Sequence, residues 1–466
     1  MSRERWNATR GEAGEADFKP PNKYRRAFDW HVRYGDAESR REQINAMANL
    51  ASSEYPDILE DFLDISRRRR NNRTALAKLQ IHMLEEIIFQ EAAVKHYRAK
   101  LRELEEDKSP GVDDAARREE RDFCKRELFF YRVYANAIRG IGDGIAWRSL
   151  GYDRAVVRLM SERATKQTIV SEGTVQELRE WSVHFDSGTG LAILNALTNC
   201  LAIGDITVVR DDGSVEIVEV KSSSAKSGRK VRQKQKMKEV VTLLSTGSGQ
   251  ADDKEVTLQT LPITPETGLP ILRDLLQAAS KSGWSSRKVS NCLYLEAFDF
   301  RELKTFEEIR QDLERAKMEA IAEWEERGDF VLDMNSMENL AFGPNCAPFS
   351  IFPFDSRTCI ELLIGSKCYV SHLNIDAVAR EFQFRGWNIE KTSEDLFREG
   401  NKDAVLTISK GGFHANVPPA DLMRLQLETV RAKTIIESYD VMYKQGPTGE
   451  EGFQLSLYAG ESEIWD

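Results

Sequence analysis

The sequence predicts a multi-domain protein of the α/β class, and three observations lead to this prediction. Its 466 residues exceed what one ordinary hydrophobic core encloses, so two or three domains are expected. Helical periodicity dominates to about residue 160, whereas short β-branched runs alternate with helical stretches over 165–300. A charged helix and further strand-like runs follow over 301–466. We therefore expect a helical region at 1–160, an α/β domain at 165–300 and a smaller α/β domain after the charged helix.

The first region is expected to be entirely helical. Apolar residues recur every three or four positions over 76–104, which is typical of an amphipathic helix. Pro110 and Gly111 interrupt this pattern, and a second helix is predicted at about 117–139. We expect this region to regulate the protein, or to join it to a second copy or to a partner protein.

Two motifs of this region admit both a binding role and a structural role. The basic run RRRRNNR at 67–73 has the composition of a nucleic-acid patch, but we interpret it as a solvated helix boundary. The glycines of GIGDGIAWRSLGYDR at 140–154 suggest a phosphate-binding loop. Because no G-K-[ST] sequence follows them, we interpret this stretch as a tight turn between helices.

The composition of the chain argues against several classes of protein. The formal net charge of -10 argues against a protein that coats nucleic acid, so a site for a polyanion must be a local basic patch. The six cysteines are scattered without the spacing of a zinc site or a disulfide framework. No apolar run has the length of a signal core or a membrane span. We expect a soluble, cytoplasmic protein with no membrane partner.

The most informative stretch is GDITVVRDDGSVEIVEVKSSSAK, which predicts two strands joined by a turn at Asp212-Gly213. Three charged residues interrupt its apolar pattern, namely Asp205, Glu219 and Lys221. Side chains alternate along a strand, so Glu219 and Lys221 are expected to share one face. An antiparallel hairpin would bring Asp205 close to them. Two neighbouring carboxylates repel each other, which favours a hard divalent cation such as Mg²⁺ between them.

The pattern of an aspartate, thirteen intervening residues and then Glu219-Val220-Lys221 resembles the PD-(D/E)xK nuclease superfamily. The resemblance covers roughly 165–265 and implies a restriction-endonuclease-like αβββαβ core. It implies that Asp205, Glu219 and the carbonyl group of Val220 hold Mg²⁺ or Mn²⁺. It also implies that Lys221 positions or activates the attacking water. The sequence has a glycine where the name of the motif has proline.

Residues on both sides of this motif are expected to complete the site. In similar nucleases a further acid precedes the aspartate strand, and the candidate metal ligand here is Glu177, with Glu180 and Glu172 as alternatives. Several members of the superfamily also carry a glutamine on the helix that follows the lysine. The apolar stripe of the predicted helix runs back to Gln233, so Gln233 is expected to face the site and Gln235 to point away.

The same predicted helix is strongly basic. We expect its side chains to contact the phosphates of the substrate without reading its sequence. The candidate nucleic-acid-binding residues are Lys226, Arg229, Lys230, Arg232 and Lys234.

Taken together, these patterns predict a Mg²⁺-dependent endonuclease that hydrolyses phosphodiester bonds in DNA, with RNA as the alternative substrate. The three-part architecture is similar to that of bacterial antiphage or restriction effectors, an analogy that bears on the biological role alone. Two alternatives remain. One is a nuclease-like fold that has no activity and binds nucleic acid or a partner protein, and the other is a nuclease of DNA repair or recombination.

Overall fold

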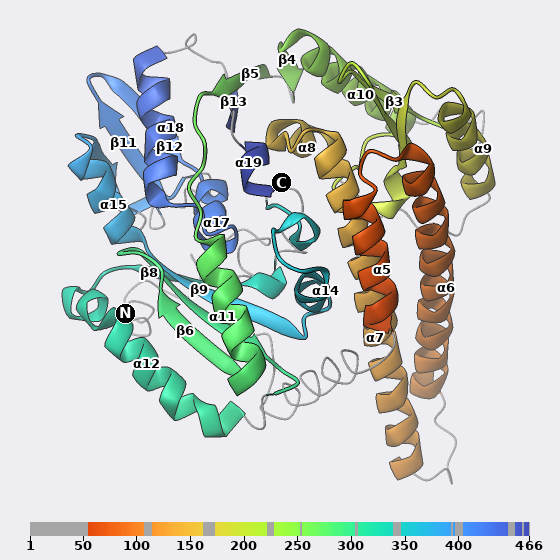
Figure 1. The fold of residues 1–466 in the computed structure, drawn as a ribbon, viewed down its shortest axis with the longest axis horizontal. Coiled ribbons are helices and arrows are strands. Elements are labelled where there is room, and N and C mark those ends of the chain that lie inside the picture. Colours follow the sequence, from red (N-terminus) through yellow and green to blue (C-terminus); the bar gives the residue numbers. More distant parts are fainter. Residues whose placement is uncertain are drawn as a thin grey trace.

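Helices and small β-sheets alternate along the chain, which confirms the predicted α/β class (Figure 1). The structure is a computed structural model of the 466-residue chain. It describes residues 55–106, 114–161, 173–220, 228–251, 254–302, 306–338, 346–392, 395–396, 404–445, 453–458 and 461–465. The statements below concern these residues.

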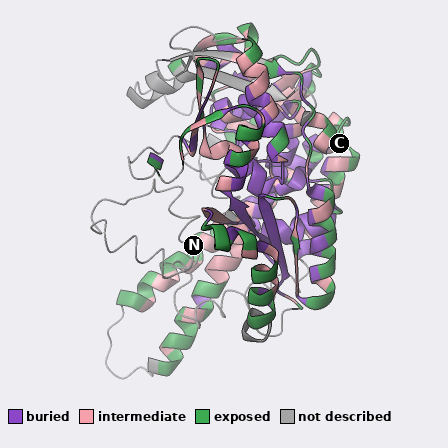
Figure 2. Ribbon diagram, turned by 90° about the vertical axis from the view of Figure 1, so that its left-hand side faces the viewer, coloured by how far each residue is buried: buried purple, intermediate pink, exposed green. Residues whose placement is uncertain are grey.

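The first region is helical, as predicted. Its two longest helices, α6 and α7, pack side by side and form most of the right-hand part of Figure 1. The first half of the predicted apolar stripe of α6, from Leu76 to Ile87, is buried, whereas Ile88 is exposed. The ends of α6 and α7 farthest from the sheets are largely exposed (Figure 2). The helices described here are α5 (Tyr55–Arg68), α6 (Arg73–Glu106), α7 (Asp114–Ser149), α8 (Arg154–Ser161) and α9 (Gly173–Asp186).

The basic run at 67–73 is a helix boundary, since α5 ends and α6 begins within it. Its first arginine is only partly exposed, however. The guanidinium of Arg67 donates hydrogen bonds to the carbonyl oxygens of Ser350, Phe352 and Phe354, at 2.7 to 3.2 Å. These bonds join α5 to a loop almost 300 residues farther along the chain.

The glycines at 140–144 do not form the predicted interhelical turn, because they lie inside α7. The predicted turn between helices is present at the end of the stretch, at 150–153, where Gly151 has a φ of 65°. Each glycine inside α7 allows another element to approach the helix closely. A Cβ atom on Gly140 would meet the end of the Leu363 side chain, and one on Gly142 would overlap the carbonyl oxygen of Leu197. Glycine therefore serves packing here, and its poor helix propensity is offset by tertiary contacts.

A meander of three antiparallel strands follows the helices, in the spatial order β1-β2-β3. The element order α9, β1, β2, β3, α10, β4 agrees with an αβββαβ core, but β4 pairs with β5 in a different sheet. The complete core therefore remains a prediction. The elements are β1 (Gly190–Leu194), η1 (Asn195–Leu197), β2 (Ile206–Arg210), β3 (Val215–Val218), α10 (Gly228–Thr246), β4 (Ser248–Ala251), β5 (Lys254–Leu261) and β13 (Phe453–Tyr458), which lies parallel to β5.

The largest sheet has four strands in the order β6-β7-β9-β8, and helices cover both of its faces. Strand β7 is buried throughout, with Leu295 in the main core and Phe298 in a second cluster with Leu313 of α12. The elements of this part are α11 (Leu269–Ser282), β6 (Trp284–Lys288), β7 (Leu293–Asp299), α12 (Phe306–Arg327), β8 (Val331–Asn335), η2 (Ser336–Glu338), η4 (Phe349–Ile351), α14 (Ser356–Ile364) and β9 (Lys367–Asn374).

The C-terminal part contains a third antiparallel sheet, in the order β10-β11-β12. Its remaining elements are α15 (Ile375–Phe384), β10 (Asn388–Lys391), β11 (Leu406–Lys410), β12 (Phe413–Val417), α17 (Pro419–Leu427), α18 (Ala432–Gln445) and α19 (Glu461–Trp465). One hydrophobic cluster extends from Leu59 to Trp465, so all three predicted regions contribute to the same core. No described helix combines the length and apolar composition that crossing a bilayer requires.

The two glycines of α7 provide a test of this packing. Both Gly140→Ala and Gly142→Ala gain about 1 kcal/mol of helix propensity. We expect Gly140→Ala to be close to neutral, because the Leu363 side chain can move, and Gly142→Ala to destabilise by about 1–3 kcal/mol through backbone overlap. Chemical denaturation of the two variants measures these changes in the free energy of unfolding. Equal stabilities would contradict the close approach of α7 and η1.

Candidate metal centre

The predicted hairpin is present. Strands β2 and β3 pair antiparallel from Ile206 with Val218 to Val209 with Val215. The turn lies at the predicted position, where Gly213 has a φ of 81° that favours glycine. The backbone N–H of Ser214 donates to the Asp212 carboxylate at 2.9 Å, a bond typical of tight turns. Local sequence therefore fixes the register of the hairpin.

Asp205 and Glu219 are the next residues outward from the last pair of this ladder. The N–H of Asp205 donates to the carbonyl of Val218 at 2.8 Å. Its carboxylate oxygen Oδ2 accepts from the N–H of Val220 at 2.6 Å. Asp205 is buried, Glu219 is exposed, and the valines on either side of Glu219 pack against the core. The hairpin thus brings the two acids to one end of the sheet, as predicted.

Of the two described candidates for an upstream acid, Glu177 is the one that interacts with this pair. Its pKa is raised from 4.5 to about 7, first by burial and then by the negative charges of Asp205 and Glu219. Glu180, on the same helix α9, lies 3.8 Å from the Nε2 atom of His184 instead. Glu172 lies outside the described residues. The three carboxyl groups of Glu177, Asp205 and Glu219 are therefore close enough to affect one another.

The chemistry of this set suits a hard divalent cation. Mg²⁺ prefers carboxylate and carbonyl oxygens and keeps several waters. Burial raises the pKa of Glu177, and the negative charges of Asp205 and Glu219 raise it further. Within the described parts of the chain, no three His, Cys, Asp or Glu side chains converge as a ready metal cage. Binding of a cation would therefore require the exposed side chain of Glu219 and the half-buried side chain of Glu177 to move toward Asp205.

Several predicted site residues lie beyond what the structure describes. Lys221 and Lys226 fall outside the described residues. The backbone of 228–234 belongs to α10, but its side chains are not described, and these include Gln233, Arg229, Lys230, Arg232 and Lys234. Gln235 is described. It is exposed and donates to Glu239 at 2.8 Å, in agreement with its predicted orientation away from the site.

Gly204, the residue before the aspartate, has a physical reason to be glycine. Its φ is 74°, in the left-handed region, and a Cβ atom there would meet Ile217 and the carbonyl oxygen of Val218. Proline holds φ near -65° and is excluded from this conformation. The departure from the proline of the family motif is therefore required by this backbone.

The helical region supports the sheet directly, through contacts that the sequence did not reveal. Strand β1 is an edge strand, and the Gln80 side chain of α6 pairs with it as a neighbouring strand would. Gln80 donates to the carbonyl of Ala192 and accepts from the N–H of Leu194, both at 2.9 Å. Trp181 of α9 also donates to Ala192, at 3.0 Å. A polar residue on the apolar stripe of α6 was the available signal.

A second support comes from Asp143 of α7, which is buried. Its carboxylate accepts from the backbone N–H groups of Asn199 and Cys200, at 2.6 and 2.9 Å, and from the Asn199 side chain at 2.9 Å. Burial raises the pKa of Asp143, and these hydrogen bonds oppose that shift. The loop between β1 and β2 is therefore fixed by α7.

Another group of titratable side chains lies under α12. His372 is buried, with Nδ1 at 2.6 Å from Asp333 and Nε2 at 3.3 Å from Glu296. Burial lowers its pKa, but the two carboxylates raise it more, to about 9. Lys317 of α12 lies 3.1 Å from the same Nδ1 atom. These charges compensate one another, so we interpret the group as structural.

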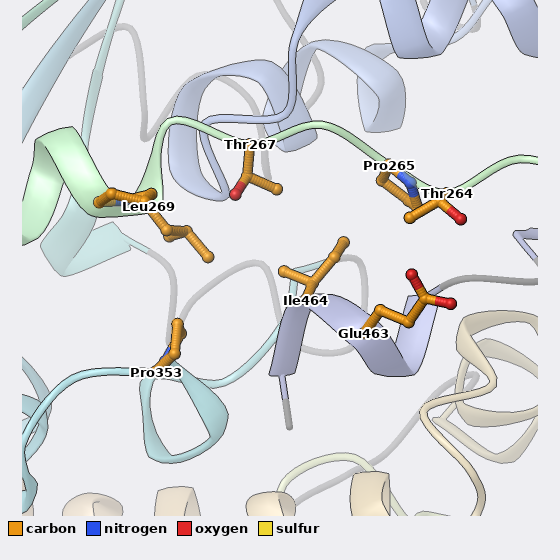
Figure 3. A pocket seen from close by; sticks show the side chains of 8 residues that line it. Thr264, Pro265, Thr267, Leu269, Pro353, Glu463 and Ile464 are labelled. Carbon is orange, nitrogen blue, oxygen red and sulfur yellow. The ribbon is translucent and has the colours of Figure 1, made fainter.

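The structure also has a half-open hollow of about 250 Å³, which shares no residue with the acidic site (Figure 3). It lies between the segment before α11 and the C-terminal helix α19. Thr267, Leu269, Pro353 and Ile464 contribute to its lining. No group of titratable side chains is directed into it in Figure 3, so it does not compete with the acidic site as a candidate centre.

Comparison with protein-family models, with curated proteins and with solved structures finds no match to this chain. The residues of the hairpin, and the chemistry that their arrangement permits, are therefore what indicates a function.

The raised pKa of Glu177 predicts a pH-dependent stability. A carboxyl group that holds its proton in the folded state to about pH 7 contributes stability that is lost as pH rises from 4.5 to 7. Since Glu177 is half exposed, we discount the effect to about 1 kcal/mol. In metal-free buffer, Glu177→Gln should therefore gain stability relative to wild type at pH 8, but not at pH 4.5.

Glu180→Gln is the matched control, because Glu180 lies on the same helix and pairs with His184. Thermal or chemical denaturation of the three proteins at both pH values makes the comparison. If the stabilities of Glu177→Gln and Glu180→Gln depend on pH in the same way, then Asp205 and Glu219 do not influence the protonation of Glu177 as we infer.

Proposed function

We propose that this chain is a metal-dependent nuclease that hydrolyses phosphodiester bonds, with DNA as its substrate. The proposal is supported chiefly by one observation. Asp205 and Glu219 lie side by side at the end of the β2–β3 ladder. The negative charges of both residues contribute to the raised pKa of Glu177. Carboxylates that are brought together favour a cation, and a cation held by them could in turn bind a phosphate group of the substrate.

Each residue has a distinct role in this proposal. Asp205 and Glu219 would hold Mg²⁺ or Mn²⁺, with the carbonyl of Val220 and the carboxylate of Glu177 as further oxygen ligands. The N–H of Val220 already binds the Asp205 carboxylate, so the aspartate is oriented before an ion arrives. When bound, the ion would polarise the scissile phosphate and lower the pKa of a water molecule.

Hydrolysis joins an oxygen of water to phosphorus and breaks the bond from phosphorus to the leaving oxygen, which departs as a hydroxyl group. Lys221, two residues after Glu219, would stabilise the charge that grows on the phosphoryl oxygens. Gln233 would orient water or the nucleic-acid backbone. The basic residues of 226–234 would hold phosphates farther along the strand, which explains how a chain of net charge -10 can bind a polyanion.

Nothing in the described residues or the sequence resembles a module that reads bases, so we propose cleavage without strong sequence specificity. The biological role that we assign, antiphage defence in bacteria, follows from the analogy of architecture. The helical region, which is bound to the sheet through Gln80, would then carry the contact with a trigger or with a second copy.

The proposal predicts nicking or linearisation of supercoiled plasmid by the purified protein with Mg²⁺ or Mn²⁺, and none with a chelator. Asp205→Asn, Glu219→Gln and Lys221→Ala should each lower the rate by about 10²–10³-fold, because each removes a charge that acts in the transition state. Gel analysis of plasmid, linear duplex, single strands and RNA identifies the substrate.

Glu216→Gln is the matched control. Glu216 lies on the same hairpin, pairs with Arg210, and precedes Glu219 by three residues. This variant should cleave at the wild-type rate. Equal cleavage by wild type and Lys221→Ala would mean that the activity comes from a contaminant, and the proposed mechanism would then be rejected.

A further inference from the structure

The buried side chain of Asn195 lies immediately behind the candidate site. Asn195 begins the short helix η1 that follows β1, and it is only 3% exposed. Its Nδ2 group donates to the carbonyl oxygens of Ile203 and Gly204, at 2.9 and 3.1 Å. Its backbone N–H donates to the carbonyl of Asp205 at 3.0 Å. One residue therefore binds three consecutive carbonyl groups that lead to the start of β2.

These carbonyl groups need such a partner. Strand β2 begins only at Ile206, so residues 203–205 lie outside the paired ladder. They are nevertheless buried, and buried carbonyl groups without a hydrogen bond are costly. The left-handed conformation of Gly204 turns this segment away from the direction of a strand. The Asn195 amide thus supplies the hydrogen bonds that a neighbouring strand cannot.

Thr207 fixes which way the amide of Asn195 points. The hydroxyl of Thr207 donates to the Oδ1 atom of Asn195 at 2.8 Å, and Thr207 is fully buried. With its oxygen held in this way, the amide presents its nitrogen to the carbonyls of Ile203 and Gly204. Reversing the amide would place its oxygen against two carbonyl oxygens. The arrangement therefore has one stable orientation.

We propose that Asn195 is a positioning residue that sets the Asp205 carboxylate for binding a divalent cation, an inference that rests on the proposed function. The backbone of Asp205 is held from one side by Asn195 and from the other by Val218 of β3. Its carboxylate is held by the N–H of Val220. With the backbone fixed on both sides, the carboxylate keeps its place beside Glu219 without an ion.

Asn195 also connects this carboxylate with the helical region. The residue after it, Ala196, accepts a hydrogen bond from Arg139 of α7 at 3.4 Å, and Leu197 lies against Gly142. A shift of α7 relative to the sheet would therefore displace η1 and, through Asn195, the segment that carries Asp205. Asn195 therefore lies between the residues that contact helix α7 and the candidate ligand Asp205.

The test measures Mn²⁺ affinity, by calorimetry or electron paramagnetic resonance, in the full-length protein and its variants. Residues that support metal ligands typically change affinity by about 10–100-fold when they are removed. We expect Asn195→Ala to weaken Mn²⁺ binding by about that factor, and Thr207→Val to weaken it less. Plasmid cleavage by Asn195→Ala should recover at high Mn²⁺ concentration, whereas cleavage by Asp205→Ala should not.

Tyr369→Phe is the control for a general loss of stability. Tyr369 is buried, and its hydroxyl donates to the carbonyl of Leu427, far along the chain from the site. This variant should bind Mn²⁺ as wild type does. If Asn195→Ala does not fold, Thr207→Val decides the question, since it keeps the amide and removes only the bond that orients it.

The possible results separate the two proposals. Wild-type Mn²⁺ affinity in folded Asn195→Ala and in Thr207→Val would overturn the positioning role and leave the proposed function intact. If the wild-type protein and Asp205→Ala bind Mn²⁺ equally well, both the positioning role and the proposed function are overturned. Weakened binding in Asn195→Ala and Thr207→Val, with wild-type binding in Tyr369→Phe, supports the positioning role.

Discussion

The rest of the candidate site depends on one constraint, which is the proximity of Asp205 and Glu219 at the open end of one β-hairpin. Two neighbouring carboxylates repel each other, and the pKa of Glu177 is raised by burial and by the charges of these two residues. This arrangement is maintained against the mutual repulsion of the carboxylates. Its persistence requires a scaffold that holds the strands in register and the aspartate in place.

That scaffold comes from several parts of the chain. Gln80 covers the edge of β1, Asp143 holds the loop after η1, and Asn195 holds the segment before β2. Two of these three residues belong to the helical region, and the hydrophobic core is continuous from α5 to α19. Within the described residues, the helical region therefore contacts the scaffold of the acidic residues through hydrogen bonds and packing.

Sequence alone was sufficient for the features that depend on local periodicity and turn chemistry. The helices α6 and α7, the β2–β3 hairpin, its turn and the placement of Asp205 beside Glu219 all follow from patterns within about thirty residues. The glycines of α7 were misread as a turn, because their role depends on Leu197 and Leu363, which are distant in sequence. Gln80 and Asn195 were missed for the same reason, since their partners are backbone groups that no side-chain pattern identifies.

The most direct test of the central claim is anomalous X-ray scattering from crystals of the protein grown with Mn²⁺. The account predicts a single strong peak bounded by the carboxylates of Asp205 and Glu219 and by the carbonyl of Val220, and its disappearance in Asp205→Ala. A peak elsewhere on the protein, or carboxylates of Asp205 and Glu219 that point to separate regions of solvent, would contradict it.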